Sequence, residues 1–459
     1  MGVVVAREFG RSAETDGFFA AYGVFIVLSI AAASLRVVVQ PQLARARADG
    51  TLGGEVAGYA VALAAVAVPV VLVSTFVSRP VGDVLTGSLP PDAAHAAAVC
   101  LQWMVPAALL QLFSALAASA LAALDDYGTV AAGYVLGSAS GLTLILLRVD
   151  EDGIVAIAWG TALTAAVGLA VPAVRLALLG RPQAPRGGLG RRILELANGA
   201  VLPLALQALY LVCVRFAADL GVGEVTSFSY AYLIGSAIVA TTASSLGLVS
   251  SVPLTRAGLG EETAARHVVA TAWLSLAVVA AAAGVFALAG ERVVSAVLGP
   301  AYAGDVGGDL GRLVAGLSPW MAASVGVTVT FPLLFVGGRR PRRLVALSLC
   351  AVVLQVVLAW AGREGAGIAG VVGSLALSTT FVLAVLLALL SRGTLRRAGR
   401  GLAAASALLA VVAAVAFIPA ALLGPLLGAA LGLAAYALLL AALRPPGLLD
   451  AWGYVRALR

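Results

Sequence analysis

The sequence predicts an all-α membrane protein whose chain crosses the bilayer many times. Three observations predict this fold class: of 459 residues 61% are hydrophobic, only 11% are charged, and the mean hydropathy is +1.04. Soluble domains have about 45–50% apolar and about 25% charged residues. Apolar runs such as residues 59–77 and 402–419 have the length of a bilayer crossing. This composition excludes a soluble enzyme, a nucleic-acid-binding domain and a disordered linker.

Thirteen apolar stretches, each roughly 20 residues long, are expected to span the bilayer as helices. They begin, in order along the chain, near residues 17, 56, 97, 128, 153, 196, 225, 268, 313, 344, 366, 402 and 423. Gly and Pro occur inside several of them, which packed membrane helices tolerate.

The distribution of arginine predicts how these helices are oriented. All 29 basic residues are Arg. Of these, 20 fall in six of the hydrophilic segments that connect or follow the predicted spans, which we call joints, whereas the other joints hold six Arg together with acidic residues. The Arg-rich joints are residues 45–47, 175–192, 256–266, 339–343, 392–400 and the tail after residue 443. Because cytoplasmic loops are enriched in Lys and Arg, we expect these joints and the carboxyl terminus on the cytoplasmic side.

This orientation has a consequence for the amino terminus. Thirteen spans that end in the cytoplasm place Met1 outside, and residues 2–6 resemble the outer end of a helix whose first turns are missing. We therefore expect a plan of fourteen helices with a truncated first helix and a translation start further upstream.

An internal repeat predicts how the helices are grouped. With the chain shifted against itself by 211–214 residues, Gly10 falls on Gly221 and Pro106 on Pro319, and residues 153–160 resemble residues 367–373. An even number of helices in the repeat unit returns the chain to the same side, so the copies are expected to be parallel six-helix lobes around a central cavity.

The predicted domains follow this repeat. They are an N-terminal lobe with an incomplete first helix (1–180), a cytoplasmic linker (181–194), a C-terminal lobe (195–400), and two additional helices with a cytoplasmic tail (401–459).

Four charged residues are candidates for contacts with a substrate in that cavity. Arg36 interrupts the apolar residues 18–39, so its side chain is expected to face the protein interior or water and to contact an anion. The alternative is that Arg36 extends to the cytoplasmic lipid headgroups. Arg7, Arg215 and Asp16 lie near the outer ends of their helices, where they either line the cavity rim or anchor the helices at the interface.

Neither catalysis nor a cofactor is predicted. His95 and His267 stand alone, the three Cys are far apart in apolar runs, and no phosphate-binding GxxxxGK[ST] motif occurs in the sequence. We expect no metal site, and the short joints leave no room for the large external loops of a membrane glycosyltransferase or polymerase.

Three segments resemble a known family. Residues 7–21 (REFGRSAETDGFFAA) resemble the first-to-second helix signature of the MurJ (MviN-type) lipid II flippases, within the multidrug/oligosaccharidyl-lipid/polysaccharide exporter superfamily. Residues 223–231 resemble the family's seventh-to-eighth helix turn, and residues 157–160 resemble its sixth helix. The similarity covers most of residues 3–392 and implies the same plan of two lobes and fourteen helices.

The resemblance also implies a function in cell-wall or polysaccharide biosynthesis. It implies a monomeric flippase of the cytoplasmic membrane that moves a lipid-linked saccharide, lipid II or a related polysaccharide precursor, to the outer leaflet by alternating access. The implied partners are this lipid, the surrounding membrane lipid and a coupling ion, without nucleic acid. The alternative within the superfamily is a multidrug or small-molecule antiporter.

The family's cavity arginines have no direct equivalents in this chain. Residues 27–30 and 232–233 are apolar, hydroxyl-bearing or aromatic where the family places Arg in its second and eighth helices. Guanidinium groups there suit a diphosphate because they bind phosphate oxygens in pairs. Arg36 is therefore the displaced candidate for this contact.

Overall fold

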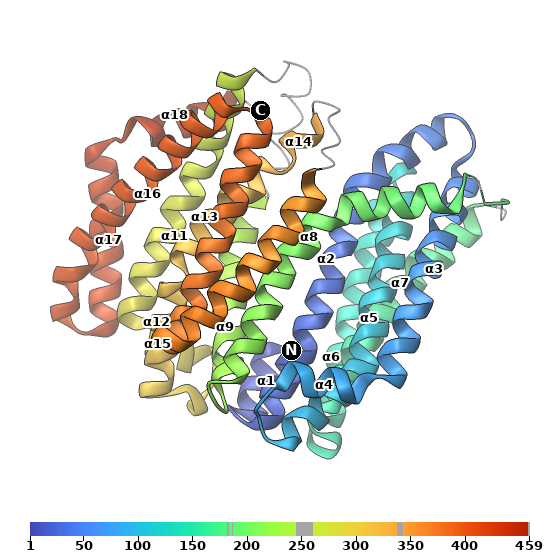
Figure 1. Ribbon diagram of the computed structural model, residues 1–459, viewed down its shortest axis with the longest axis horizontal. Helices are drawn as coiled ribbons and strands as arrows, with labels where there is room; N and C mark the ends of the chain where they lie inside the picture. Colours follow the sequence, from blue (N-terminus) through green and yellow to red (C-terminus); the bar gives the residue numbers. More distant parts are fainter. Residues whose placement is uncertain (181–182, 186, 245–259, 337–342, 458–459) are drawn as a thin grey trace. The chain divides into compact units, whose positions relative to one another are not determined.

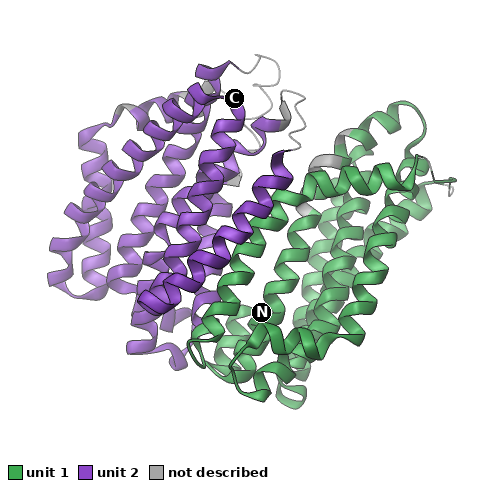
Figure 2. Ribbon diagram, in the orientation of Figure 1, with its two compact units in different colours: residues 1–226 green, residues 227–459 purple. Residues whose placement is uncertain are grey.

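The computed structural model describes residues 1–180, 183–185, 187–244, 260–336 and 343–457 (Figure 1). Within these ranges the chain is an all-α polytopic membrane protein without strands, as the sequence predicts. Among the described residues, eleven helices are long and apolar enough to cross a bilayer, or twelve if the bent pair α12 and α13 forms one span. The chain divides into two compact units, Met1–Thr226 and Ser227–Arg459 (Figure 2). The predicted domain boundaries stay a prediction.

Unit 1 is a bundle of long helices that surrounds α5. Its elements are α1 (Gly2–Phe9), α2 (Ala13–Ala48), α3 (Leu52–Phe76), α4 (Ser78–Thr86), α5 (Pro91–Ala123), α6 (Tyr127–Asp152), α7 (Val155–Leu179) and α8 (Leu189–Ala218). The first of these, α1, has only 8 residues.

The packing of α2 against α5 depends on small residues. A Cβ atom on Gly17 would lie 2.1 Å from the carbonyl oxygen of Ala93, so the two backbones approach closely at this point. Membrane helices associate through such small residues because the lipid supplies no hydrophobic driving force. Ser12 caps α2 by accepting a hydrogen bond of 3.2 Å from the Thr15 amide.

Unit 2 consists of α9, which begins at its border, and the helices after it. Its elements are α9 (Glu224–Val239), η1 (Ala240–Ser244), α11 (Glu261–Leu298), η2 (Pro300–Tyr302), α12 (Asp305–Gly316), α13 (Ser318–Thr330), α14 (Leu333–Val336), α15 (Arg343–Leu390), α16 (Arg392–Ala420), η3 (Ala421–Leu423), α17 (Pro425–Leu443) and α18 (Pro446–Ala457).

The element α15 consists of two helices joined at a kink, and it contains two of the predicted spans. Its backbone leaves the helical conformation at Ala366 and at Gly367, whose φ is 56° and ψ is −134°. Gly153, which the repeat aligns with Gly367, ends α6 with almost the same angles, φ 60° and ψ −142°. A positive φ is accessible to glycine at no steric cost. The two repeat positions therefore make the same kind of tight turn between consecutive spans.

The span that was expected to start near residue 313 has a different shape. It is a bent pair, α12 followed by α13, with an angle of 41° between the helices. Pro319 lies in the first turn of α13, where its missing N–H is tolerated, whereas its repeat partner Pro106 lies inside the unbroken α5.

Candidate functional site

Asp16 is fully buried at one end of unit 1, where it caps the start of α9. Its Oδ2 atom accepts a hydrogen bond of 2.5 Å from the Gly223 amide. Its Oδ1 atom accepts from the amide (2.9 Å) and the hydroxyl (2.6 Å) of Thr226. The first amides of a helix have no partner inside the helix, and a carboxylate is well suited to satisfy them. Three donors of the protein thus occupy the Asp16 carboxylate.

A second contact reinforces this junction. Arg11 donates from Nε to the Gly223 carbonyl oxygen at 3.2 Å, and its Nη2 lies 3.4 Å from a carboxylate oxygen of Glu224. The segment 11–16 therefore holds both the turn before α9 and the first residue of that helix. This network joins two of the segments, residues 7–21 and 223–231, whose sequences resemble the flippase family.

The other two predicted rim residues lie at different places. Arg215 pairs with Asp219 one turn further along the chain, with 2.6 Å between Nη1 and Oδ1. The guanidinium lies against Gly87, because a Cβ atom on that glycine would be 2.5 Å from Nη1. Arg7 is exposed on α1.

Arg36 lies deep along α2, far from these residues. Asp16 precedes it by 20 residues, about 30 Å of helix, and Arg47 follows it by 11 residues, about 16 Å. Arg47 lies at the end of the neighbouring helices, since its Nη1 is 2.5 Å from the Ala123 carbonyl oxygen and 2.6 Å from Asp125. The structure therefore does not bring the four predicted residues into one cluster.

Arg36 has an aromatic partner that the sequence did not indicate. Its Nη2 donates a hydrogen bond to the hydroxyl of Tyr134 on α6, and its guanidinium carbon lies 5.7 Å from the centre of that ring. Its Nε atom is buried and has no acceptor among the described residues. No carboxylate pairs with Arg36 within the described part of the chain, so its charge is compensated only by a phenol.

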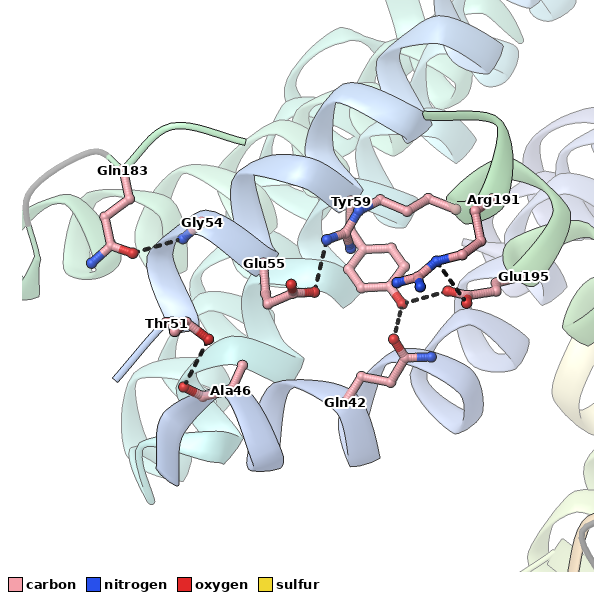
Figure 3. Close-up of polar contacts among 10 residues, drawn as sticks. Gln42, Ala46, Thr51, Gly54, Glu55, Tyr59, Gln183, Arg191 and Glu195 are labelled. Atoms are coloured by element: carbon pink, nitrogen blue, oxygen red, sulfur yellow. Dashed lines mark hydrogen bonds and ion pairs between the residues drawn. The ribbon is translucent and has the colours of Figure 1, made fainter. Parts of the chain in front are cut away.

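A further polar network of unit 1 was also not predicted (Figure 3). Arg192, at the start of α8, is 1% exposed; its Nη2 lies 2.8 Å from the Glu55 carboxylate on α3, and its guanidinium carbon lies 4.3 Å from the centre of the Tyr59 ring. The Tyr59 hydroxyl lies between Gln42 on α2 and Glu195 on α8, 3.1 Å from the latter. We call these five residues the Tyr59 cluster.

The Tyr59 cluster fixes three helices to one another. Two further contacts extend it toward solvent: Arg191 lies 3.5 Å from Glu195, and the Gln183 side chain accepts a hydrogen bond of 3.0 Å from the Gly54 amide (Figure 3). A buried guanidinium that is paired with a carboxylate and stacked on an aromatic ring is rigid. This network therefore sets where α8 begins relative to α2 and α3.

Nothing in the described residues has the composition of a metal centre. Among them, no group of three or more His, Cys, Asp or Glu side chains is placed to hold an ion.

Comparison with known proteins identifies the fold. No model of a protein family and no curated protein sequence matches the chain. Among solved structures, the chain is similar to the lipid II flippase MurJ in an inward closed conformation, with a TM-score of 0.67 and 13% identity over 96% of each chain. It is also similar to an inward-facing multidrug resistance MATE family transporter of the MOP superfamily, with a TM-score of 0.66 and 19% identity over 88% of this chain and 93% of that one.

A third similar structure is a MOP superfamily transporter from Pyrococcus furiosus. The TM-score is 0.56 and the identity is 16%, over 88% of this chain and 96% of the other. All three similarities extend over nearly the whole length of both chains. The chain therefore has the fold of the MOP superfamily transporters.

Proposed function

We propose that this protein is a membrane transporter that moves a lipid-linked saccharide from the cytoplasmic to the outer leaflet of the cytoplasmic membrane. The fold supports transport in general, because its structural neighbours are described as a lipid flippase and as multidrug transporters. The substrate class is the finer part of the proposal. In this proposal the chain acts as a monomer, performs no covalent chemistry, and uses the membrane potential or an ion gradient.

The observation that carries the substrate class is Arg36. Arg36 follows the apolar span Ala13–Ala32 of α2 by four residues, and a guanidinium this close to the hydrocarbon core costs free energy to insert unless something compensates its charge. Tyr134 supplies a hydroxyl and a ring face but no negative charge. A phosphate or diphosphate that joins a lipid to a saccharide would supply that charge and could bind two guanidinium N–H groups at once.

The alternative is an antiporter of drugs or small cations, as in the MATE family. Such a protein is expected to keep a carboxylate available within a spanning helix. Asp16 is the buried carboxylate of α2, but it lies in the first turn of the helix, and three donors of the protein already occupy it. This arrangement favours the anionic substrate.

The proposal is tested with the purified chain in liposomes that contain a fluorescent lipid-linked saccharide. Flipping is measured as the growth of the saccharide fraction that an impermeant reagent reaches. We expect Arg36→Ala to slow flipping by at least about tenfold, the effect of about 1.4 kcal/mol. Arg36→Lys should restore part of the rate, because an ammonium group carries the charge without the paired donors.

Arg45→Ala is the matched control. Arg45 lies on the same helix nine residues further along, and it is exposed, so its removal should leave the rate unchanged. Normal flipping by Arg36→Ala would reject the role of Arg36. Export of cationic dyes by a chain that flips no saccharide lipid would reject the proposed substrate class in favour of the antiporter.

A further inference from the structure

The helix α16 of unit 2 begins with arginines rather than with acidic residues. Arg392 is its first residue, Arg396 and Arg400 follow at intervals of four, and its first turn contains no acidic residue. The amino terminus of a helix carries partial positive charge, so acidic side chains stabilise it and basic ones destabilise it. The Ser391 hydroxyl accepts a hydrogen bond of 2.9 Å from the Thr394 amide, but this cap adds no negative charge. The start of α16 therefore concentrates positive charge that its own helix does not compensate.

The neighbouring helix α11 starts at the same level as α16 and runs in the same direction. A Cβ atom on Gly393 of α16 would lie 2.1 Å from the carboxylate of Glu261, the first residue of α11. Eight residues later on both helices, a Cβ atom on Gly401 would lie 2.6 Å from the Val269 side chain. The two helices are therefore parallel and in register, and residues 261–266 lie beside residues 392–400.

These two helix starts carry more positive than negative charge. Residues 392–400 contain four arginines, all exposed, and residues 261–266 contain an exposed arginine, Arg266, and two glutamates. Arg397 is paired with one of the glutamates, since its Nη1 lies 3.5 Å from a carboxylate oxygen of Glu262. Within the described part of the chain, the other three arginines of α16 form no ion pair. Five arginines thus face two glutamates, which leaves an excess of three positive charges.

The three unpaired arginines lie on the outer face of α16. Thr394 and Ala398 are buried and mark the inner face of the helix. Arg396 is two residues from each of them, which is about 200° of helical rotation, so it lies on the opposite side. Arg392 and Arg400 are one turn before and one turn after Arg396 on the same side. We call these three residues the arginine face.

Beyond the arginine face, the same side of α16 is apolar and nearly flat. It continues with exposed alanines that follow Arg396 or Arg400 by seven or 14 residues, which is close to two or four helical turns. These alanines extend over about 16 Å of helix, the depth of one leaflet of the hydrocarbon core. They are Ala403, Ala407, Ala410 and Ala414, which we call the alanine strip.

Larger side chains border the alanine strip along one edge. Leu408, Val411 and Val415 are exposed and follow one another at intervals of three and four residues, so they form a ridge parallel to the strip. Small side chains let a neighbouring chain approach the helix closely. An aliphatic chain on the strip would therefore contact the alanines from above and the ridge from the side.

We propose that the arginine face and the alanine strip together bind an anionic phospholipid of the surrounding membrane. Arg396 and Arg400 donate hydrogen bonds to its phosphate, and one acyl chain lies along the alanine strip. The bound lipid compensates the positive charge at the start of α16 and so stabilises this helix in unit 2. This inference goes beyond the proposed function, since the lipid is a ligand of the outer surface of α16 and not the transported substrate.

The excess charge favours an anionic headgroup over a zwitterionic one. Arg396 and Arg400 are separated by about 6 Å along the helix, so both guanidinium groups can reach one phosphate. A phosphocholine group would bring its own cation to a surface that already has three positive charges in excess. The arginine distribution also predicts this end of α16 at the cytoplasmic face, where anionic lipids attract basic segments.

The experiment uses the full chain in phosphatidylcholine nanodiscs that contain a trace of photoreactive phosphatidylglycerol or photoreactive phosphatidylcholine, with the reactive group in one acyl chain. After illumination and digestion, mass spectrometry measures the ratio of labelling by the two lipids on residues 403–415. The internal reference is the same ratio on Leu426, Leu427 and Leu431, which are exposed at the uncharged start of α17. We expect the ratio on residues 403–415 to exceed the reference at least about fivefold, the effect of one basic side chain.

Removal of the arginine face tests the headgroup contact. The combination of Arg392→Gln, Arg396→Gln and Arg400→Gln should lower the ratio on residues 403–415 to the reference. The matched control removes three exposed arginines from other parts of the surface and should leave the ratio unchanged. It combines Arg79→Gln, Arg292→Gln and Arg312→Gln.

A bulky side chain on the alanine strip tests the acyl-chain contact. Ala407→Trp occupies the strip from an exposed position and should lower labelling of residues 403–415 by phosphatidylglycerol roughly fivefold. Val353→Trp, at a side chain of α15 that is 63% exposed, is the control and should label residues 403–415 as the unmodified chain does.

The inference fails if the ratio on residues 403–415 of the unmodified chain equals the reference, or if either test variant labels normally. It also fails if millimolar inorganic phosphate abolishes the enrichment, because the arginine face would then bind a free anion rather than a lipid. Flipping is measured separately. Normal flipping without enrichment rejects this inference alone, and enrichment without flipping rejects only the proposed function.

Discussion

Asp16 and Arg36 lie on the same helix but have opposite surroundings. The Asp16 carboxylate accepts three hydrogen bonds from the turn before α9 and from its first residues. The Arg36 guanidinium has a phenol as its partner and a buried Nε atom without an acceptor in the described chain. A satisfied buried group stabilises the fold, whereas an unsatisfied one is costly and suggests a ligand. This contrast separates the structural charge from the candidate binding charge.

Replacing Asp16 should therefore affect stability first. Asp16→Asn converts one accepting oxygen into a donor that faces other donors, and we expect a loss of about 1–3 kcal/mol in the free energy of unfolding. The measurement is thermal unfolding in detergent. Glu14→Gln, at an exposed position one half-turn earlier, is the control and should unfold like the unmodified chain. An Asp16→Asn protein that unfolds normally but no longer transports would instead assign Asp16 to the transport mechanism.

Two consecutive arginines, Arg192 in the Tyr59 cluster and Arg191 beside it, give a second test. Arg192 is 1% exposed and paired with Glu55, whereas the Arg191 side chain is 68% exposed. We expect Arg192→Gln to lower the free energy of unfolding by about 3–5 kcal/mol, because it leaves a carboxylate without its partner. Arg191→Gln should cost no more than about 1 kcal/mol. Equal losses in denaturation curves of the two variants would show that burial of Arg192 adds nothing to stability.

The sequence identified single charges in apolar segments but not the partners of these charges. Arg36 is visible because it interrupts an apolar run, while Tyr134 lies 98 residues later in a different span. The Tyr59 cluster combines residues near positions 42, 55–59 and 192–195, and its arginine falls in a segment that was predicted to be a linker. Only the pattern of Arg191, Arg192 and Glu195 at a helix start could have indicated it. Contacts between distant helices depend on packing, which no local pattern encodes.

At the scale of elements, hydropathy located the spans and one internal break but not the other. The predicted start near residue 366 coincides with the turn of α15 at Ala366 and Gly367, whereas the bend of 41° between α12 and α13 was not predicted. The helix α4 was not predicted, because nine amphipathic residues do not form an apolar run of membrane length. Length and hydropathy therefore identify spans, whereas glycine conformations and close approaches define how the spans connect.

The two halves of α15 pack against each other through glycine. A Cβ atom on Gly370 would lie 1.9 Å from the Gly362 carbonyl oxygen, whereas a Cβ atom on Gly373 would meet nothing within 4 Å. We expect Gly370→Ala to lower the free energy of unfolding by about 1–3 kcal/mol through overpacking. Gly373→Ala should be neutral or stabilising by up to about 1 kcal/mol, because Ala is the better helix former. The measurement is thermal unfolding of the two variants in detergent. A Gly370→Ala protein as stable as Gly373→Ala would contradict the close approach of Gly370 to Gly362.

The start of α6 provides a test that depends on pH. Asp126 caps this helix, and its hydrogen bond with the Arg175 side chain, followed by bonds from Thr129, lowers the pKa of its carboxyl below the usual 3.8. A lowered pKa means that the stabilisation is complete above the unfolded-state pKa and is lost as the pH falls through the folded-state pKa.

The measurement is the midpoint of thermal unfolding at successive pH values between about 6 and 3. The unfolding midpoint of the unmodified chain should exceed that of Asp126→Asn by a constant amount near pH 6. This difference in midpoint should shrink below about pH 4. Arg175→Gln should shift this decline to higher pH. An advantage that grows on acidification would contradict the assigned direction of the pKa shift.

At the scale of the whole molecule, the orientation in the membrane is a prediction from arginine alone. The fold of the MOP superfamily agrees with a polytopic protein, but the sidedness depends on the contrast between 20 arginines in one set of joints and six in the other. Some of the Arg-rich joints, residues 256 and 339–342, lie outside the described residues. The joints at Gly188 and Arg396 on the predicted inside, and at Asp150 and Asp305 on the predicted outside, lie within them.

Cysteine accessibility tests this orientation in intact cells. After Cys100, Cys213 and Cys350 are replaced by Ser or Ala, single cysteines are introduced by Gly188→Cys, Arg396→Cys, Asp150→Cys or Asp305→Cys. These positions suit the assay because Asp150, Asp305, Gly188 and Arg396 are all exposed, and a Cβ atom on Gly188 meets nothing within 4 Å. An impermeant maleimide should label positions 150 and 305 in whole cells and positions 188 and 396 only after permeabilisation, because Arg-rich loops stay in the cytoplasm. Reversed labelling of any two positions would invert the predicted orientation.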